Sequence, residues 1–236
     1  MGRAFEFRKA RKMKRWGKMA VTFSRIGKEI AMAVKQGGPE PDNNPRLRVV
    51  IQNAKAENMP KEKVDNAINR AASKDQKDYA EVVYEGMGPY GVGIVIETAT
   101  DNATRTVANM RLAFNRNNGE LGKSGSLDFI FERKCIFKIE PGTLNIDTLE
   151  LELIDFGLED IEQNEGETLI YTAFSDYGTM QKGLELNNIA IISVDKERIP
   201  LITIELNAEQ MEEANKLIDR LEEDEDVQAV FHNIKI

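Results

Sequence analysis

The sequence predicts an α+β protein with a helical first third, followed by two small α/β sandwich units in which helices pack on one face of antiparallel sheets. Apolar residues recur at helical spacing up to about residue 72, and strand-like runs alternate with helical runs from about residue 79 onward. A polar hinge, SKDQKD at residues 73–78, separates the two patterns. With 236 residues and 41% hydrophobic content, the chain can bury a sizeable core.

Three helices are predicted before the hinge. The first covers residues 21–36, stops at the glycine pair 37–38, and has an apolar face formed by Phe23, Ile26, Ile30, Ala33 and Val34. The second covers residues 45–58, and the third begins after Pro60, because proline suits the first turn of a helix. The short connection between them fits either a DNA-reading helix-turn-helix or an ordinary helical hairpin, and the sequence leaves both open.

Strands and helices alternate in the prediction for the remainder of the chain. The expected strands are residues 81–86, 92–100, 127–139, 167–174, 190–206 with an interruption at Pro200, and 229–236. The expected helices are residues 102–117, 147–157, 177–186 and 207–221.

Capping residues mark the ends of two of these helices. Asn207 and Gln210 have the spacing of a capping box at the start of the last helix, whose apolar stripe is continuous. Asp147 and Glu150 have the same spacing, and Gly157 favours a stop. The leucines between them alternate as in a strand, but the caps favour a helix.

Charge is divided unevenly along the chain. Residues 1–75 hold 18 lysines and arginines against 8 acids, a net charge of +10, whereas residues 76–236 hold 14 against 32, a net charge of −18. The first twenty residues, here called the basic arm, contain one acid, Glu6, and eight cations: Arg3, Arg8, Lys9, Arg11, Lys12, Lys14, Arg15 and Lys18. A cation cluster this dense indicates a polyanionic partner.

Composition excludes several classes of protein. No run of 18 apolar residues and no secretory signal is present, so we expect a cytoplasmic protein with no membrane partner. The basic arm imitates a transit peptide, but it has no serine before Ser24 and carries Glu6. One cysteine, Cys135, and one histidine, His232, provide neither a disulfide nor a zinc site. Because Cys135 lies in an apolar run, we expect a buried thiol rather than a nucleophile.

Two motifs imitate ligand sites. Residues 86–91 match G-x-G-x-x-G, but a strand-like run follows where a dinucleotide site needs a helix, so we expect a turn. The acidic run 222–226 lacks the spacing of a calcium loop, and we expect a solvated helix end. Asn102 is expected to cap the helix that follows it. No catalytic set can be assembled, so we expect no enzyme activity, cofactor, metal or small-molecule substrate.

The functional hypothesis is that the basic arm contacts nucleic-acid phosphates, with Phe5, Phe7 and Trp16 stacking on exposed bases. The alternative is a solvated basic tail. We favour binding, because uncompensated charge of one sign repels itself and needs a counter-surface. On the first predicted helix, Arg25 and Lys28 lie opposite the apolar face and are added to the candidates.

Several motifs together resemble the YebC/PmpR family over nearly the whole chain. They are GGPEPDNNPRLR, NAKAENMPKEKV, YEGMGPYGVGIVIETATDNATRTV and GELGKSGSLDFIFERK. The resemblance implies three domains: a basic helical domain (1–78), a discontinuous middle α/β domain (79–136 plus 201–236) and an inserted α/β domain (137–200), both ferredoxin-like. It adds Arg46, Arg48, Lys55 and Lys61 as nucleic-acid contacts.

The family is described both as DNA-binding transcriptional regulators and as ribosome-associated translation factors, including a mitochondrial translational activator of cytochrome oxidase. The resemblance therefore implies a regulator of gene expression that binds duplex DNA, or alternatively a translational activator bound to ribosomal RNA and the ribosome. This chain departs from the usual G-H-S-K-W start, since Gly2 is followed by Arg3-Ala4-Phe5-Glu6, and from the usual Gly-Asp at Pro39-Glu40.

Overall fold

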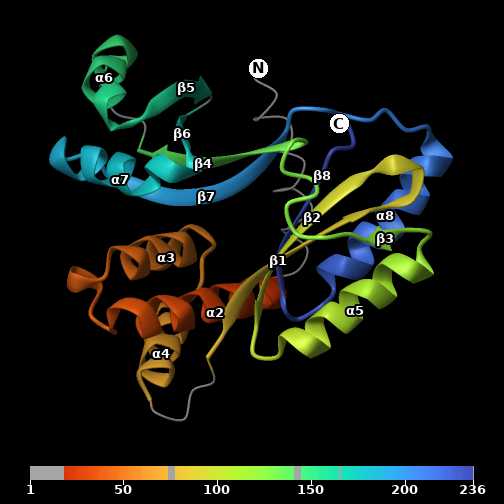
Figure 1. The fold of residues 1–236 in the computed structure, drawn as a ribbon. Helices are drawn as coiled ribbons and strands as arrows, with labels where there is room; N and C mark the ends of the chain where they lie inside the picture. Colours follow the sequence, from red (N-terminus) through yellow and green to blue (C-terminus); the bar gives the residue numbers. More distant parts are fainter. Residues whose placement is uncertain (1–18, 74–77, 141–144, 165, 236) are drawn as a thin grey trace.

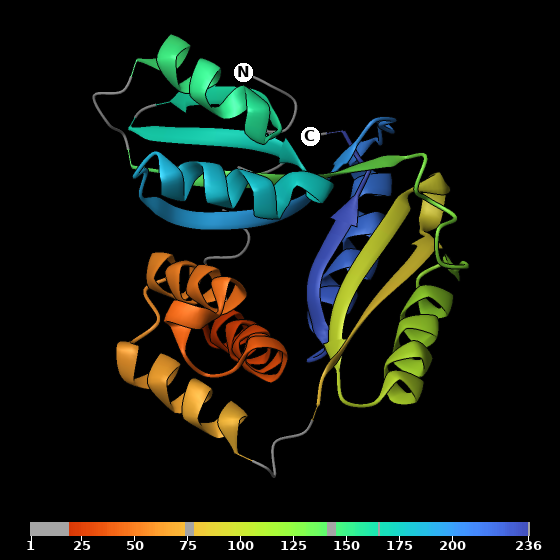
Figure 2. The same ribbon diagram turned by 60° about the vertical axis from the view of Figure 1, so that its left-hand side comes forward.

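The computed structural model describes residues 19–73, 78–140, 145–164 and 166–235. They form a helical domain that lies beside two four-stranded antiparallel sheets, each packed against two helices (Figures 1 and 2). The expected α+β class is therefore confirmed.

The helical domain consists of α2 (Met19–Gly37), α3 (Pro45–Ala56) and α4 (Lys61–Ala72), in agreement with the sequence pattern. Asn44, which is buried, fixes the turn between α2 and α3. Its side-chain oxygen accepts a hydrogen bond from Leu47 N (3.0 Å), which caps α3, and its amide donates to Ala33 O (2.8 Å). Apolar side chains from all three helices close one core around Ile30 and Leu47.

The middle body has the sheet order β3-β1-β2-β8 and two helices. Its elements are β1 (Ala80–Met87), β2 (Gly93–Thr100), α5 (Ala103–Arg116), β3 (Glu120–Leu121), α8 (Ala208–Glu222) and β8 (Val227–His232). The G-x-G-x-x-G segment forms the turn of the β1–β2 hairpin, in which Tyr90 has a positive φ of 61° and Gly91 one of 77°. The prediction of a turn is confirmed.

The second body has the sheet order β5-β6-β4-β7. Its elements are β4 (Phe131–Ile139), α6 (Ile146–Leu153), β5 (Leu158–Asn164), β6 (Glu167–Ala173), α7 (Tyr177–Leu186) and β7 (Ile191–Pro200). This β-α-β-β-α-β order is ferredoxin-like, whereas the middle body follows the order β-β-α-β and later α-β. The expected boundary at residue 136 falls inside β4, all of which pairs within the second sheet.

Three strand predictions were too long, and the one over residues 229–236 passes the end of β8 at His232. Residues 127–130 form turns before β4 begins, and residues 201–206 carry only an isolated bridge between Ile204 and Ile234. Leu127 and Ile130 are nevertheless buried, against the outer face of the middle sheet. Their apolar character reflects this burial rather than strand pairing. The edge strand β5 was missed, because LEDIEQN contains few apolar residues.

The helix caps agree with the sequence except at α6. Asn207 and Gln210 form the expected capping box on α8, and Asn102 accepts a hydrogen bond from Arg105 N (3.1 Å) at the start of α5. In α6 the cap is Asn145, which accepts from Asp147 N (3.0 Å), and not Asp147 as predicted. With Asn145 as the cap, α6 begins at Ile146, one residue before the predicted start.

Candidate nucleic-acid interface

The fourteen candidate residues divide into two groups. The eight cations of the basic arm and the stacking candidates Phe5, Phe7 and Trp16 lie outside the described residues. The other six lie on the helical domain: Arg25 and Lys28 on α2, Arg46, Arg48 and Lys55 on α3, and Lys61 at the start of α4.

Helix α2 contacts the middle body through two of its cations, Arg25 and Lys28. Lys28 Nζ lies 2.9 Å from a carboxylate oxygen of Asp226 and also donates to the carbonyls of Ala99 (3.1 Å) and Glu225 (2.7 Å). Arg25 donates to Glu222 O at the end of α8 (2.9 Å). Both side chains are partly buried, so their charges are directed into the protein.

Asp226 is the centre of this contact. Besides Lys28, it accepts hydrogen bonds from Arg105 Nη2 (2.6 Å), Thr106 Oγ1 (2.8 Å) and Thr100 Oγ1 (3.1 Å). Burial opposes ionisation, but the hydrogen bonds from Arg105, Lys28 and Thr106 prevail and lower the pKa of Asp226 to about 2. The expectation that the acidic run is solvated is therefore wrong for this residue, which is 3% exposed.

Helix α3 contacts both sheets. Arg46 forms an ion pair with Glu81 on β1, and Arg48 Nη2 lies 3.1 Å from a carboxylate oxygen of Glu185 on α7. Asn53 Nδ2 donates to Val194 O on β7, and Asn53 Oδ1 accepts from Val194 N, both at 2.8 Å. Because α3 is held between α2 and β7, the arginines on it bridge domains in this arrangement.

Lys55 and Lys61 are exposed, and neither forms a hydrogen bond or ion pair within the part of the chain that the structure describes. Lys63 and Arg70 on α4 are exposed as well; they were not among the predicted contacts. Lys63 lies over the Phe23 ring, with its Nζ 5.1 Å from the ring centroid. The six described candidates therefore do not form one continuous free face: four bridge domains and two remain open.

The acidic partners of these cations could not be identified from the sequence. Glu81, Glu185 and Asp226 lie 35, 137 and 198 residues from their partners along the chain. No local pattern reports such a pairing. The only signal was the opposite net charge of the two parts of the chain, which is compatible with attraction between them.

These features define a class of protein: a basic helical domain attached through charged contacts to two acidic α/β sandwiches, the middle one completed by the end of the chain. The family description "TACO1/YebC protein N-terminal domain" matches residues 3–74, and "TACO1/YebC second and third domain" matches residues 79–234. The chain belongs to the TACO1/YebC family, and the resemblance of its motifs is confirmed.

Relatives that match this chain over its full length share the same descriptive name. Proteins of Parabacteroides distasonis (59% identical, 100% of this chain and 97% of the relative) and Porphyromonas gingivalis (56%, 100% and 98%) are each named "Probable transcriptional regulatory protein". Among solved structures, a conserved hypothetical protein from Aquifex aeolicus superposes with a TM-score of 0.74 at 33% identity, covering 93% of this chain and 91% of that one. No helix among the described residues is long and apolar enough to cross a membrane.

Proposed function

We propose that this protein regulates gene expression by binding nucleic acid, as a DNA-binding transcriptional regulator whose contacts lie on the basic helical domain. The observation that carries the proposal is the charge division, +10 over residues 1–75 against −18 over the rest. Such a division confines attraction for a polyanion to one end of the molecule. The printed names of the full-length relatives support a regulatory role.

The proposed contacts are the basic arm together with Lys55 and Lys61. Lysine and arginine bind phosphate oxygens and release counterions, which supplies affinity without sequence specificity. Arg25, Lys28, Arg46 and Arg48 already have acidic or carbonyl partners within the protein. They would reach phosphate only if the helical domain separated from the sandwiches, so the basic arm supplies most of the proposed affinity.

Salt dependence tests this proposal. If about six phosphates are neutralised on duplex DNA, the logarithm of affinity falls against the logarithm of salt concentration with a slope of about −5. Replacing the eight arm cations by glutamine should flatten that slope. A control in which Lys182 and Lys196, two exposed lysines of the second body, become glutamine should leave it unchanged. An unaltered slope in the arm variant would contradict binding through the arm.

The acidic sandwiches favour a second candidate, a ribosome-associated translational activator. In that function the basic domain binds ribosomal RNA while the sandwiches, with a net charge of −18 over residues 76–236, face basic ribosomal proteins. Crosslinking in cells, followed by sequencing of the attached DNA and RNA, separates the two. Discrete ribosomal RNA positions support the translational role, and promoter DNA without RNA enrichment supports the transcriptional one.

A further inference from the structure

Helix α5 is basic, although the part of the chain that contains it is acidic. Residues 102–119 contain three arginines and no acid, although residues 76–236 as a whole hold 14 cations against 32 acids. Arg105 is used inside the protein, where it pairs with Asp101 (2.9 Å) and Asp226 (2.6 Å). Arg111 and Arg116 are exposed, and neither has a hydrogen bond or ion pair to another described residue.

The two arginines lie on the face of α5 that points away from the sheet. The buried side of the helix is formed by Thr106, Met110, Ala113 and Phe114. At 100° per residue, Leu112 and Asn115 fall on the opposite side, and Arg111 and Arg116 flank them at its two edges. Leu112 is 46% exposed. The face thus combines two guanidinium groups, an amide and an apolar side chain, all open to a partner.

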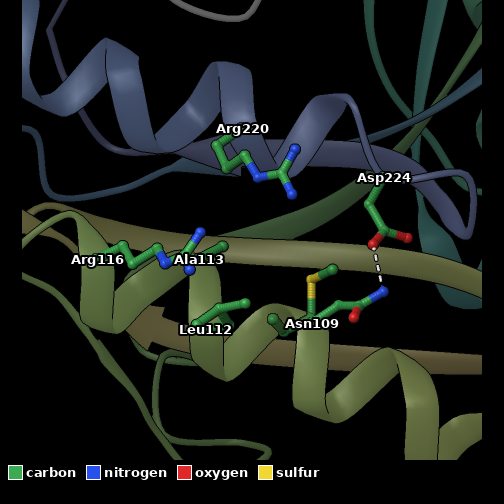
Figure 3. Close-up of a pocket in the computed structure, with 7 residues that line it drawn as sticks. Asn109, Leu112, Ala113, Arg116, Arg220 and Asp224 are labelled. Atoms are coloured by element: carbon green, nitrogen blue, oxygen red, sulfur yellow. Dashed lines mark hydrogen bonds between the residues drawn. The ribbon is translucent and has the colours of Figure 1, made fainter.

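A small groove continues this face toward α8 (Figure 3). It is lined by Asn109, Met110, Leu112, Ala113, Arg116, Arg220 and Asp224. Arg116 from α5 and Arg220 from α8 lie on opposite sides of it. The one carboxylate in the lining, Asp224, accepts hydrogen bonds from Asn109 Nδ2 and from Asp226 N, each at 2.9 Å. Its negative charge is therefore partly compensated within the protein.

We infer that this face, defined by Arg111, Leu112, Asn115, Arg116 and Arg220 and here called the α5 face, is a second contact surface for the phosphodiester backbone of a nucleic-acid strand. Guanidinium groups bind phosphate oxygens in a bidentate manner, and an exposed amide donates to phosphate or sugar oxygens. Leu112 offers apolar contact to a sugar or base. The inference rests on the proposed function for its partner, but it places the contact on the acidic body, away from the arm.

The partner is a nucleic acid rather than an acidic protein segment because of the chemistry of the surface. Arg111 and Arg116 are five residues apart on one helix, a rise of about 7.5 Å. Arg116 and Arg220 lie on opposite sides of the groove, Arg220 also pairs with Glu223 (3.4 Å), and Arg111 lies at the other edge of the exposed face. The surface thus presents separate anion contacts, which suit a strand with a phosphate on every nucleotide. An acidic protein segment is the competing partner, and polyglutamate represents it in the experiment.

The test uses the full chain with a labelled 20-nucleotide RNA, the matching single-stranded DNA and a 20-base-pair DNA duplex, and measures affinity over a range of salt. The variant R111Q/R116Q removes two charges that have no described partner. Its control, K182Q/K196Q, removes two from the second body. We expect the slope against salt to become shallower by about 1.4 on a single strand or about 1.8 on the duplex, with the control unchanged. The probe for which the slope changes identifies the type of nucleic-acid strand that binds the α5 face.

Failure of this inference differs from failure of the proposed function. If the wild-type chain binds none of the three probes, both are overturned. If it binds and R111Q/R116Q keeps the wild-type slope, only the α5 face is overturned. Polyglutamate that binds as tightly as RNA and loses affinity equally in the variant also overturns it, in favour of an acidic protein partner. Should R111Q/R116Q fold poorly by circular dichroism, R111K/R116K replaces it; we expect that variant to retain the slope but bind more weakly.

Discussion

At the scale of single residues, Asp226 has the largest structural consequence. It ends a run of five acids, of which Glu223 and Glu225 are exposed, and nothing in the sequence indicates its burial. It nevertheless binds Lys28 of the helical domain and Arg105 of α5 at once. Cys135 shows the opposite case. Its apolar neighbours predicted a buried thiol; the residue is fully buried, and burial raises its pKa to about 11. Local composition reports burial in a strand, but not a long-range ion pair.

Replacing Asp226 by asparagine should lower the free energy of unfolding at pH 7 by about 3 kcal/mol, because Lys28 and Arg105 lose their charged partner. Urea unfolding measures this loss. The control Asp65→Asn, at an exposed position on α4, should change stability by less than about 0.5 kcal/mol. An equal effect of both substitutions would contradict a special role for Asp226.

The same carboxylate makes the free energy of unfolding depend on pH. Its pKa is lowered from 3.8 to about 2 in the folded protein, so its contribution is present above about pH 4 and is lost as the pH falls toward 2. The contribution is on the order of 2 kcal/mol. Unfolding free energies measured between pH 5 and pH 2 should therefore fall less in Asp226→Asn than in the wild type.

At the scale of elements, most helices could be predicted from the sequence, but the ends of several strands could not. Apolar spacing indicates helices α2, α5 and α8, and α5 and α8 also have caps that act within four residues. Residues 127–130 are apolar because Leu127 and Ile130 cover the outer face of the middle sheet. Residues 201–206 link β7 to α8, and their Leu201 and Ile202 are each 52% exposed. Pairing of a strand depends on a distant partner, which an apolar run alone does not specify.

The capping box of α8 offers a test at this scale. Substituting alanine for Asn207 removes the acceptor for Gln210 N (2.9 Å) and should cost about 1 kcal/mol of stability, measured by denaturant unfolding. Asn66, exposed within α4 and without a capping role, provides the control. Alanine there should be neutral or slightly stabilising, because alanine has the higher helix propensity. Equal losses at both positions would argue against the cap.

At the scale of the whole molecule, cations of the basic part pair with acids of the acidic part. The charge division is visible in the sequence, but nothing in the sequence indicates that Arg46 and Arg48 contact Glu81 and Glu185. Ion pairs between domains depend on how the domains pack, and no periodicity records that. The location of a nucleic-acid site on the basic domain therefore stays a prediction, and the sequence did not indicate which of its residues already have partners within the protein.

Freeing the bridging arginines should strengthen nucleic-acid binding, if the basic domain is the binding surface. In the variant E81Q/E185Q, Arg46 and Arg48 lose their carboxylate partners and become available for phosphate. We expect the slope of affinity against salt on duplex DNA to steepen by up to about 1.8. The control E140Q/E150Q removes two exposed acids of the second body and thus the same net charge. Equal steepening in both variants would indicate a general charge effect instead.

The paired hydrogen bonds between Asn53 and Val194 have a consequence for assembly. β7 is an edge strand of the second sheet, and an open edge is a template on which another chain can add a strand. The amide of Asn53 occupies the outward N–H and C=O of Val194, as a neighbouring strand would, while α3 lies along the same edge. The helical domain thus shields the sheet from edge-to-edge aggregation, and any motion that releases Arg46 and Arg48 from the sandwiches also exposes this edge.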